Sequence, residues 1–404
     1  MYSAYSVGPA VTSPSGDVSL SDPTGRGGTQ SFRVHQFSPA GVHVGSFVGW
    51  SASSGANRPT YLGIDPLDNT LYTVNSSGAA DFQERRAIRR PPDGVGTQTI
   101  GGTYLGIVGW DVRFGNAGGD AAGHWLVQFD ATTNSSFPSC GSAGCGFDFG
   151  SGVETGSRVL RFDAAGTYLG SIPSPGTWRL DPAGKLHVIK GFTGTTDLGC
   201  GPLTGGSGAS FALAKLDLDG MCLASKAFSA PEPTTFTLAG DGSILLGIVH
   251  TGTIDLGGGA LPDLGGKNLT IAKLDLDGNV LATRTVGGTG STFTNITLDA
   301  APSGIIVLSA SFTGTVDLGA GPIGNAGDTL LAAFDPDGTL RWSKVVNVGS
   351  TVYNFAYPSL NIAWQPCSML VATTSTTVDL GAGPVVPVPA QFNSADMAVI
   401  GLAL

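Results

Sequence analysis

Short apolar runs separated by glycine, aspartate and proline make up most of the chain. Three of them, LHVIKGF at 186–192, ILLGIVH at 244–250 and IIVLSASF at 305–312, are almost continuously apolar. Helical periodicity is nearly absent. Runs of this length bounded by turn residues predict β-strands, and continuous apolar character predicts strands that are covered on both faces. The pattern therefore predicts an all-β fold built from many short strands.

The same order of runs and turns returns roughly every 60 residues. The units at 177–228, 234–286 and 292–348 each hold an apolar run, the phrase Thr-x-Asp-Leu-Gly, a second apolar run, an Asp-x-Asp-Gly turn and a last strand. Four strands per repeat at this period predict a β-propeller rather than a helical solenoid. The aspartates of the repeated phrase are Asp197, Asp255, Asp317 and Asp379.

Fainter copies upstream extend the pattern to seven units, and the expected blades are 6–48, 60–100, 105–172, 177–228, 234–286, 292–348 and 355–404. The second and third units are irregular, so six or eight blades remain alternatives. The last unit ends without a fourth strand, and the opening residues MYSAY resemble one. Residues 1–6 are therefore expected to complete the last blade, which would close the ring of a single domain and protect two strand edges.

Composition narrows the functional classes. The 404 residues include 63 glycines, and the formal net charge is −10 with only 20 lysines and arginines, which argues against a nucleic-acid groove. No apolar run is long enough for a transmembrane segment. The opening residues show no signal peptide, yet low lysine content and five cysteines favour an exported protein. Either the protein is cytoplasmic or its leader is not part of this chain, and we expect the second, an extracytoplasmic monomer.

The repeated unit resembles the repeat of a known protein family. The order G-x-x-D-L-G-G-G, an Ala-Lys-Leu-Asp strand, D-x-D-G and a Trp-Ser-Lys-like strand is similar to the bacterial SBBP β-propeller repeat of secreted proteins and lipoproteins, notably of myxobacteria-like lineages. Units at 177–228, 234–286, 292–348 and 355–404 carry the resemblance. It implies a propeller fold and an extracytoplasmic setting, and it implies no catalytic residues.

The repeated aspartates have two interpretations. An Asx-type turn needs one acceptor in every copy, so Asp197, Asp255, Asp317 and Asp379 are interpreted as structural caps, with a cation site as the alternative. The Asp-x-Asp-Gly turns could suggest calcium loops, but the further ligands and the distal glutamate of such loops are missing. We interpret them as hairpins and expect no metal or other cofactor, with calcium as the open alternative.

The cysteines fall into two groups. Cys140 and Cys145 lie in an insertion between the second and third strands of the third unit, and Cys200 occupies the matching loop of the fourth. A disulfide between Cys140 and Cys145 is the first choice, and a bond from one of them to Cys200 is the second. Cys222 and Cys367 are expected near the opposite face and unpaired.

Candidate binding residues are few. ERRAIRR places Arg85, Arg86, Arg89 and Arg90 together in an acidic protein. A solvated outer strand is the default interpretation, and a contact with an anion or acidic glycan is the sharper one. Arg113 and Trp125 complete the set of candidate binding residues.

No Ser/His/Asp arrangement, G-x-S-x-G elbow, phosphate loop or HExxH motif is visible, so no catalytic residue is assigned. The sequence favours a non-enzymatic scaffold that binds a protein or glycan partner through its long inter-strand loops. The alternative is a hydrolase or lyase at the mouth of the central channel. A multivalent lectin is disfavoured, because the six tryptophans do not recur at one repeat position.

Overall fold

The fold is all-β. The computed structural model describes residues 10–12, 18–24, 30–37, 43–52, 59–77, 82–105, 110–133, 147–149, 153–154, 156–239, 241–300, 303–319, 321–323, 329–346, 360–363, 367–374, 378–379, 384–385 and 396–403. None of these residues is helical. The described part of the chain accordingly contains no helix that could span a membrane.

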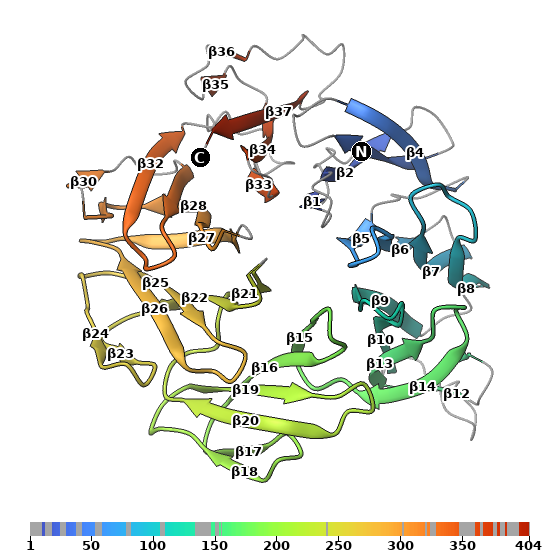
Figure 1. Cartoon of the computed structure of the whole chain (residues 1–404), viewed down its shortest axis with the longest axis horizontal. Coiled ribbons are helices and arrows are strands. Elements are labelled where there is room, and N and C mark those ends of the chain that lie inside the picture. The colour runs from blue at the N-terminus through green and yellow to red at the C-terminus, as the bar shows by residue number, and fades with distance from the viewer. Residues whose placement is uncertain are drawn as a thin grey trace.

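Seven larger sheets are formed by the described strands, and Figure 1 shows them arranged like spokes around a common axis. We number them in chain order. Sheet 1 contains β1 (Ala10–Thr12), β2 (Val18–Thr24), β3 (Gln30–Phe37) and β4 (His43–Ala52). Sheet 2 contains β5 (Pro59–Ile64), β6 (Thr70–Ser77), β7 (Phe82–Arg90) and β8 (Gln98–Leu105). Sheet 3 contains β9 (Trp110–Gly119), β10 (Trp125–Thr133), β13 (Gly156–Phe162) and β14 (Tyr168–Pro173).

The later sheets follow the repeat identified in the sequence. Sheet 4 contains β15 (Thr177–Leu180), β16 (Leu186–Phe192), β19 (Ser210–Leu216) and β20 (Cys222–Phe228). Sheet 5 contains β21 (Thr235–Leu238), β22 (Ile244–His250), β25 (Asn268–Leu274) and β26 (Val280–Val286). Sheet 6 contains β27 (Thr292–Ala300), β28 (Ile306–Thr313), β31 (Thr329–Phe334) and β32 (Leu340–Val346). Sheet 7 contains β33 (Leu360–Ala363), β34 (Cys367–Thr374) and β37 (Asp396–Ala403).

Five two-stranded antiparallel ribbons are inserted between the second and third strands of sheets 3 to 7 in the described residues. We call them ribbons 3 to 7, after the sheet that carries each. They are β11 (Phe147–Asp148) with β12 (Val153–Glu154), β17 (Thr195–Asp197) with β18 (Pro202–Thr204), β23 (Ile254–Asp255) with β24 (Ala260–Leu261), β29 (Val316–Asp317) with β30 (Pro322–Ile323), and β35 (Val378–Asp379) with β36 (Pro384–Val385). Figure 1 shows the ribbons at the periphery of the ring.

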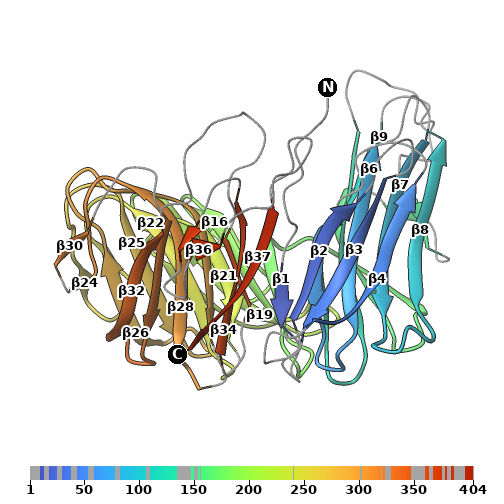
Figure 2. The same cartoon turned by 90° about the horizontal axis from the view of Figure 1, so that it is seen from above.

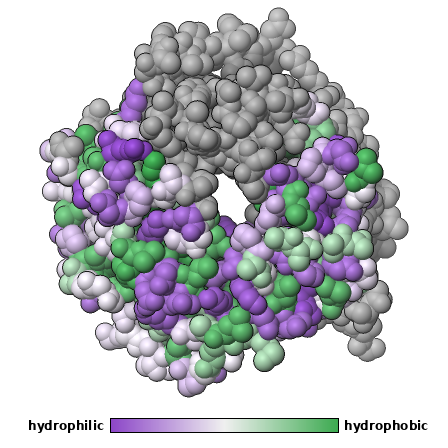
Figure 3. Space-filling model, in the orientation of Figure 1, coloured by the Kyte–Doolittle hydropathy of each residue, from purple (hydrophilic) through white to green (hydrophobic). Residues whose placement is uncertain are grey.

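Within sheets 1 to 6 every strand pairs with the neighbouring strands antiparallel, and the first strand of each sheet lies nearest the common axis. Figure 2 shows the strands running between the two faces of the ring. Figure 3 shows a narrow opening at its centre. This radial arrangement of antiparallel sheets around an axis is the β-propeller architecture that the repeat predicts.

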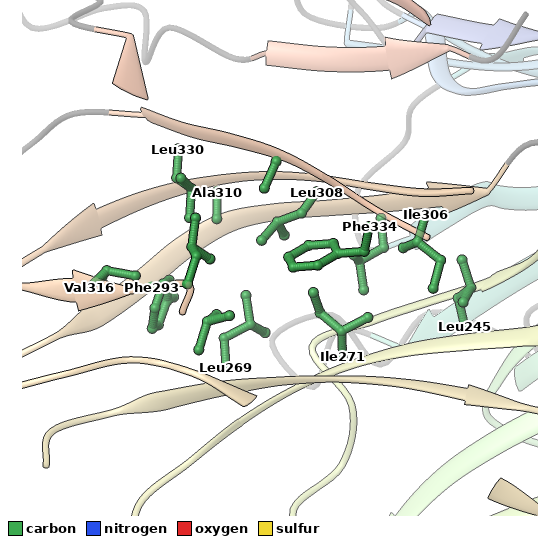
Figure 4. Packing of buried hydrophobic residues seen from close by; sticks show 14 of the residues in the cluster. Leu245, Leu269, Ile271, Phe293, Ile306, Leu308, Ala310, Val316, Leu330 and Phe334 are labelled. Atoms are coloured by element: carbon green, nitrogen blue, oxygen red, sulfur yellow. The ribbon is translucent and has the colours of Figure 1, made fainter. Parts of the chain in front are cut away.

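The core lies between adjacent sheets, as the continuous apolar strands predict. In β22 the residues Ile244 to Ile248 are all buried, and so are Ile306 to Ala310 of β28. Leu245, Leu269 and Ile271 of sheet 5 pack against Ile306, Leu308 and Phe334 of sheet 6 (Figure 4). A strand that contacts a neighbouring sheet on each face has no solvent side, which is why the apolar residues do not alternate with polar ones.

The Asp-x-Asp-Gly turns are tight hairpins between the third and fourth strands. The Asp217 Oδ1 atom accepts hydrogen bonds from the backbone N–H groups of Asp219 and Met221, both at 2.9 Å. Gly220 has a φ of 82°, a left-handed conformation that glycine adopts without steric cost. The Asp217 carboxylate therefore stabilises the turn in which it lies, as the hairpin interpretation of this motif requires.

The first and last sheets of the described chain are neighbours. β1 of sheet 1 lies beside β33 of sheet 7, as Figure 1 also shows. β37 has β34 on one side and no second partner among the described strands. Residues 1–6, which we expect to complete the last blade, lie outside the described residues.

Candidate interaction surface

The repeated Thr-x-Asp-Leu-Gly phrase forms the first strand and the turn of a ribbon. The Asp197 Oδ1 atom accepts hydrogen bonds from the backbone N–H groups of Gly199 at 2.7 Å and Gly201 at 3.1 Å. Asp255 makes the same two contacts with Gly257 and Gly259, and Asp317 makes them with Gly319 and Gly321. The Asp379 side chain lies outside those that the structure describes. In three ribbons, therefore, the carboxylate closes its own turn.

The residues on either side of the aspartate attach the ribbon to the core. Ile254 and Leu256 of ribbon 5 are buried among residues of sheets 4 and 5. Val316 and Leu318 of ribbon 6 are buried between sheets 5 and 6. The phrase is thus repeated because it encodes one packing unit, with two apolar anchors and an acceptor between them.

Replacing Asp255 by Ala should lower the free energy of unfolding by about 1–2 kcal/mol, because two backbone donors lose their acceptor. The measurement is urea unfolding followed by tryptophan fluorescence. Asp255→Asn is the matched control, since its amide oxygen can still accept, and it should lose less. We expect EDTA to leave the wild-type curve unchanged. If EDTA destabilised the wild type as much as the alanine substitution does, the calcium interpretation would replace the cap.

Ribbon 3 is a fifth copy that the sequence analysis missed. Its FDFGSG at 147–152 corresponds to TDLGCG at 196–201, with Asp148 in the place of Asp197 and Phe149 in the place of Leu198. Phe149 packs on Phe114, Phe129 and Tyr168 at ring-centroid distances of 6.5, 5.4 and 5.6 Å. The D-x-G-x-G spacing was the available signal, but phenylalanine in place of leucine and the preceding insertion concealed it.

Each ribbon of sheets 3 to 5 is attached to the first residue of the outermost strand. Tyr168, Cys222, Val280 and Leu340 occupy this position in sheets 3 to 6, and each follows a register shift in the third-to-fourth strand pair. The Tyr168 hydroxyl donates to the Glu154 carboxylate of ribbon 3, and the Cys222 sulfur is bonded to Cys200 of ribbon 4. Val280 packs against the apolar cluster that contains Ile254 and Leu256 of ribbon 5. The same attachment is therefore made by three different kinds of contact.

The Cys200–Cys222 disulfide corrects the sequence-based assignment. Cys222 was expected to be unpaired and near the opposite face, and this was wrong. The expectation assumed that a loop between second and third strands stays at one end of the sheet. Ribbon 4 instead folds back over the sheet, and its second strand β18 contacts the outermost strand β20. Cys140 and Cys145 lie outside the described residues, as does the Cys367 side chain.

Glu154 fixes the base of the sheet 3 insertion. It stands where ribbons 4 and 5 have Leu203 and Leu261, and it is largely buried. Its Oε2 atom accepts from the Ser171 hydroxyl at 2.8 Å and lies 3.6 Å from Arg158 Nε. Together with Phe149, this carboxylate ties the returning end of the insertion to β13 and β14.

Two candidate binding residues are buried. Trp125 has 1% of its surface exposed and packs on Phe162 at 4.9 Å between ring centroids, so its assignment to a binding surface was wrong. The bulk of an indole fills the space between sheets 2 and 3. Arg89 is buried too, with its Nε atom 3.1 Å from Asp65 Oδ2.

The arginine-rich strand is not the outer strand that the sequence suggested. β7 is the third strand of sheet 2 and is paired with β6 and β8. Arg90 lies over the Phe47 ring at 4.4 Å from its centroid, so this guanidinium is used in packing between sheets 1 and 2. Arg86 is half-buried and also has an interaction partner. The Arg85 and Arg113 side chains lie outside those described, and their role in binding stays a prediction.

Burial shifts the pKa values of three titratable groups. Burial lowers the pKa of His187, whose Nε2 atom lies 2.9 Å from Asp181 Oδ2. Burial also lowers the pKa of His250, whose ring nitrogens face the Gly252 carbonyl and the Thr270 hydroxyl. On the innermost strand β27, burial raises the pKa of Asp299 to about 7. Among the described residues no three His, Cys, Asp or Glu side chains are grouped so as to hold a metal ion.

Comparison with known proteins bears on the fold. No protein-family model matches the sequence, and no curated protein matches it. The chain is similar to the crystal structure of puromycin hydrolase, with a TM-score of 0.50 and 14% identity over 95% of this chain and 54% of that chain. This chain thus spans about half the length of that hydrolase. At this identity the likeness concerns the fold alone.

Two propeller structures are more distant matches. The Dos1 propeller gives a TM-score of 0.39 with 11% identity over 98% of this chain and 86% of that chain. The β-propeller domain of the trilobed protease from Pyrococcus furiosus gives 0.32 with 7% identity over 96% of each chain.

Proposed function

We propose that this protein is a non-enzymatic, extracytoplasmic propeller that binds a protein or glycan partner through the loop inserted in sheet 3. The observation that carries the proposal is the construction of that loop. Thirteen residues, 134–146, separate the end of β10 from ribbon 3, and ribbon 3 is tied to the sheet through Phe149 and Glu154. A long loop on a fixed base is a common form of binding site on a rigid scaffold.

The scaffold in this proposal is a closed propeller of seven four-stranded blades, of the kind that the SBBP-like repeat implies. The seven larger sheets and the neighbouring positions of β1 and β33 support it. Residues 1–6 would pair with β37 and supply the fourth strand of the last blade. A closed ring suits a binding scaffold because it leaves no long unpaired strand edge between its first and last blades.

The extracytoplasmic setting is supported by the Cys200–Cys222 disulfide, because structural disulfides occur mainly in oxidising compartments. The negative net charge of −10 favours a partner that is neutral or basic over a polyanion. Within the ribbons, the apolar anchors are used for packing, so the partner would contact the polar outer faces and the loop.

Shortening the sheet 3 loop tests the proposal. A variant that lacks residues 135–145 keeps Phe149 and Glu154 and should unfold at the same urea concentration as the wild type. It should lose the partner that the wild-type chain retains in a pull-down from the extracellular fraction, because the loop would supply the contacts. The control removes residues 206–208 from the corresponding loop of sheet 4 and should keep the partner. Retention by the 135–145 variant, with loss on replacing Arg85 and Arg86, would move the site to sheet 2.

A further inference from the structure

The disulfide takes over a contact that sheets 3 and 5 make without a covalent bond. Cys200 lies in the turn of ribbon 4, and Cys222 is the first residue of the outermost strand β20. In ribbon 5 the corresponding residues are Gly258 and Val280, and Val280 packs against the apolar cluster that contains the anchors Ile254 and Leu256. In ribbon 3 the same strand position holds Tyr168, which is hydrogen bonded to Glu154.

Ribbon 4 is packed more weakly than its neighbours. Its two anchor positions hold Thr196 and Leu198, and both are only half-buried. The same positions in ribbons 5 and 6 are fully buried, with Ile254 and Leu256 in one and Val316 and Leu318 in the other. A threonine in place of isoleucine or valine contributes less apolar burial, so ribbon 4 depends more on its covalent link.

Ribbon 6 has a further attachment. The Asp317 backbone N–H donates to the Gly287 carbonyl at 2.9 Å, which joins this ribbon to the segment that connects sheets 5 and 6. The Arg284 guanidinium also donates to the Leu318 carbonyl. Ribbon 4 shows no such attachment among the described backbone hydrogen bonds. Beyond the pairing of its two strands, it has one from the Gly205 N–H to the Gly194 carbonyl, and both residues belong to the same inserted loop.

We propose that the Cys200–Cys222 disulfide is a redox-sensitive strap that holds ribbon 4 against β20, and that its reduction releases the ribbon while the sheets stay folded. Cys200 is exposed and Cys222 is partly exposed, so a dithiol reductant can reach the bond. The dithiol gives two electrons and two protons, the S–S bond breaks, two thiols form, and the dithiol becomes a disulfide.

Release would change the surface around β20. Met221 and Leu223, on either side of Cys222, are already 68% and 50% exposed. Detachment of ribbon 4 would add Leu198 to this apolar surface and uncover the outer edge of β20, which has no other neighbour in the order of sheet 4. The reduced protein would therefore present a larger apolar surface and a more open strand edge than the oxidised protein. This inference is independent of which partner the sheet 3 loop binds.

Hydrogen exchange followed by mass spectrometry on the full chain, with and without dithiothreitol, tests the strap. We expect peptides covering 195–204 to exchange about tenfold faster or more after reduction, because the link no longer limits local opening. Peptides covering ribbons 5 and 6 are the internal control and should not change. C200S should exchange like the reduced wild type without reductant. C200G/C222V, which copies the sheet 5 pair, should be insensitive to dithiothreitol.

Three results would overturn the inference. Unchanged exchange at 195–204 after reduction would show that the disulfide does not hold the ribbon. Faster exchange throughout the chain would show a bond needed for the whole fold rather than a local strap. Labelling of both thiols in the oxidised preparation would show that the bond does not form.

Discussion

Asp65→Ala is expected to lower the free energy of unfolding by about 3–5 kcal/mol, because it leaves a buried arginine without its counter-charge. The Asp65 and Arg89 side chains are 0% and 7% exposed, and Arg89 Nε lies 3.1 Å from Asp65 Oδ2. Asp65 also accepts from the backbone N–H groups of Leu67 and Asn69 and from the Asn69 amide. One substitution would thus remove the partners of several buried donors. Urea unfolding gives the measurement.

Asp120→Ala is the matched control. Asp120 occupies the same turn in sheet 3, accepts the His124 backbone N–H at 2.8 Å and contacts the His124 ring at 2.9 Å. The His124 side chain is 36% exposed, so water can replace the carboxylate as its hydrogen-bond partner, and we expect a loss of only about 1–2 kcal/mol. The double variant D65A/R89L should recover part of the loss. Equal effects of D65A and D120A, or no recovery in the double variant, would show that the uncompensated charge is not the cause.

The repeat could be predicted from sequence because its determinants are local. Asp255 precedes the two glycines whose N–H groups it accepts by two and four residues. The Asp217 turn likewise contains its own glycine of positive φ. A segment of a few residues is therefore enough to recognise either motif in the sequence. The apolar second strands are equally local, since burial on both faces removes the polar alternation in β22. For these features, sequence and structure carry the same information.

The attachment of the ribbons could not be read in this way. Whether Cys200 meets Cys222 or Cys140 depends on the direction in which ribbon 4 leaves its sheet, and that direction is set by packing between sheets. Arg89 illustrates the same difficulty, because its charge suggested a surface while its partner Asp65 lies 24 residues away. Trp125 was assigned to a binding surface because nothing in the neighbouring sequence indicates that sheets 2 and 3 pack together at this residue.

Gly314→Ala should lower the free energy of unfolding by about 3 kcal/mol or more, the combined result of backbone strain and a backbone clash. Gly314 has a φ of 74°, and a Cβ atom placed on it would lie 2.4 Å from the Gly290 carbonyl oxygen. That oxygen belongs to the segment between sheets 5 and 6, which ribbon 6 joins through the Asp317 N–H to Gly287 hydrogen bond. Either ribbon 6 or this segment must move, and Val316 and Leu318 are anchored in the core beside it.

The repeat supplies two matched controls for this prediction. Gly194 and Gly252 occupy the same position in sheets 4 and 5, with φ values of 73° and 71°, and a Cβ atom on either would have no neighbour within 4 Å. Gly194→Ala and Gly252→Ala should therefore cost only the left-handed strain, about 1–2 kcal/mol. Three substitutions with the same local conformation then separate strain from clash. Equal losses at all three positions would show that the contact with Gly290 relaxes freely and that left-handed strain alone accounts for the loss at Gly314.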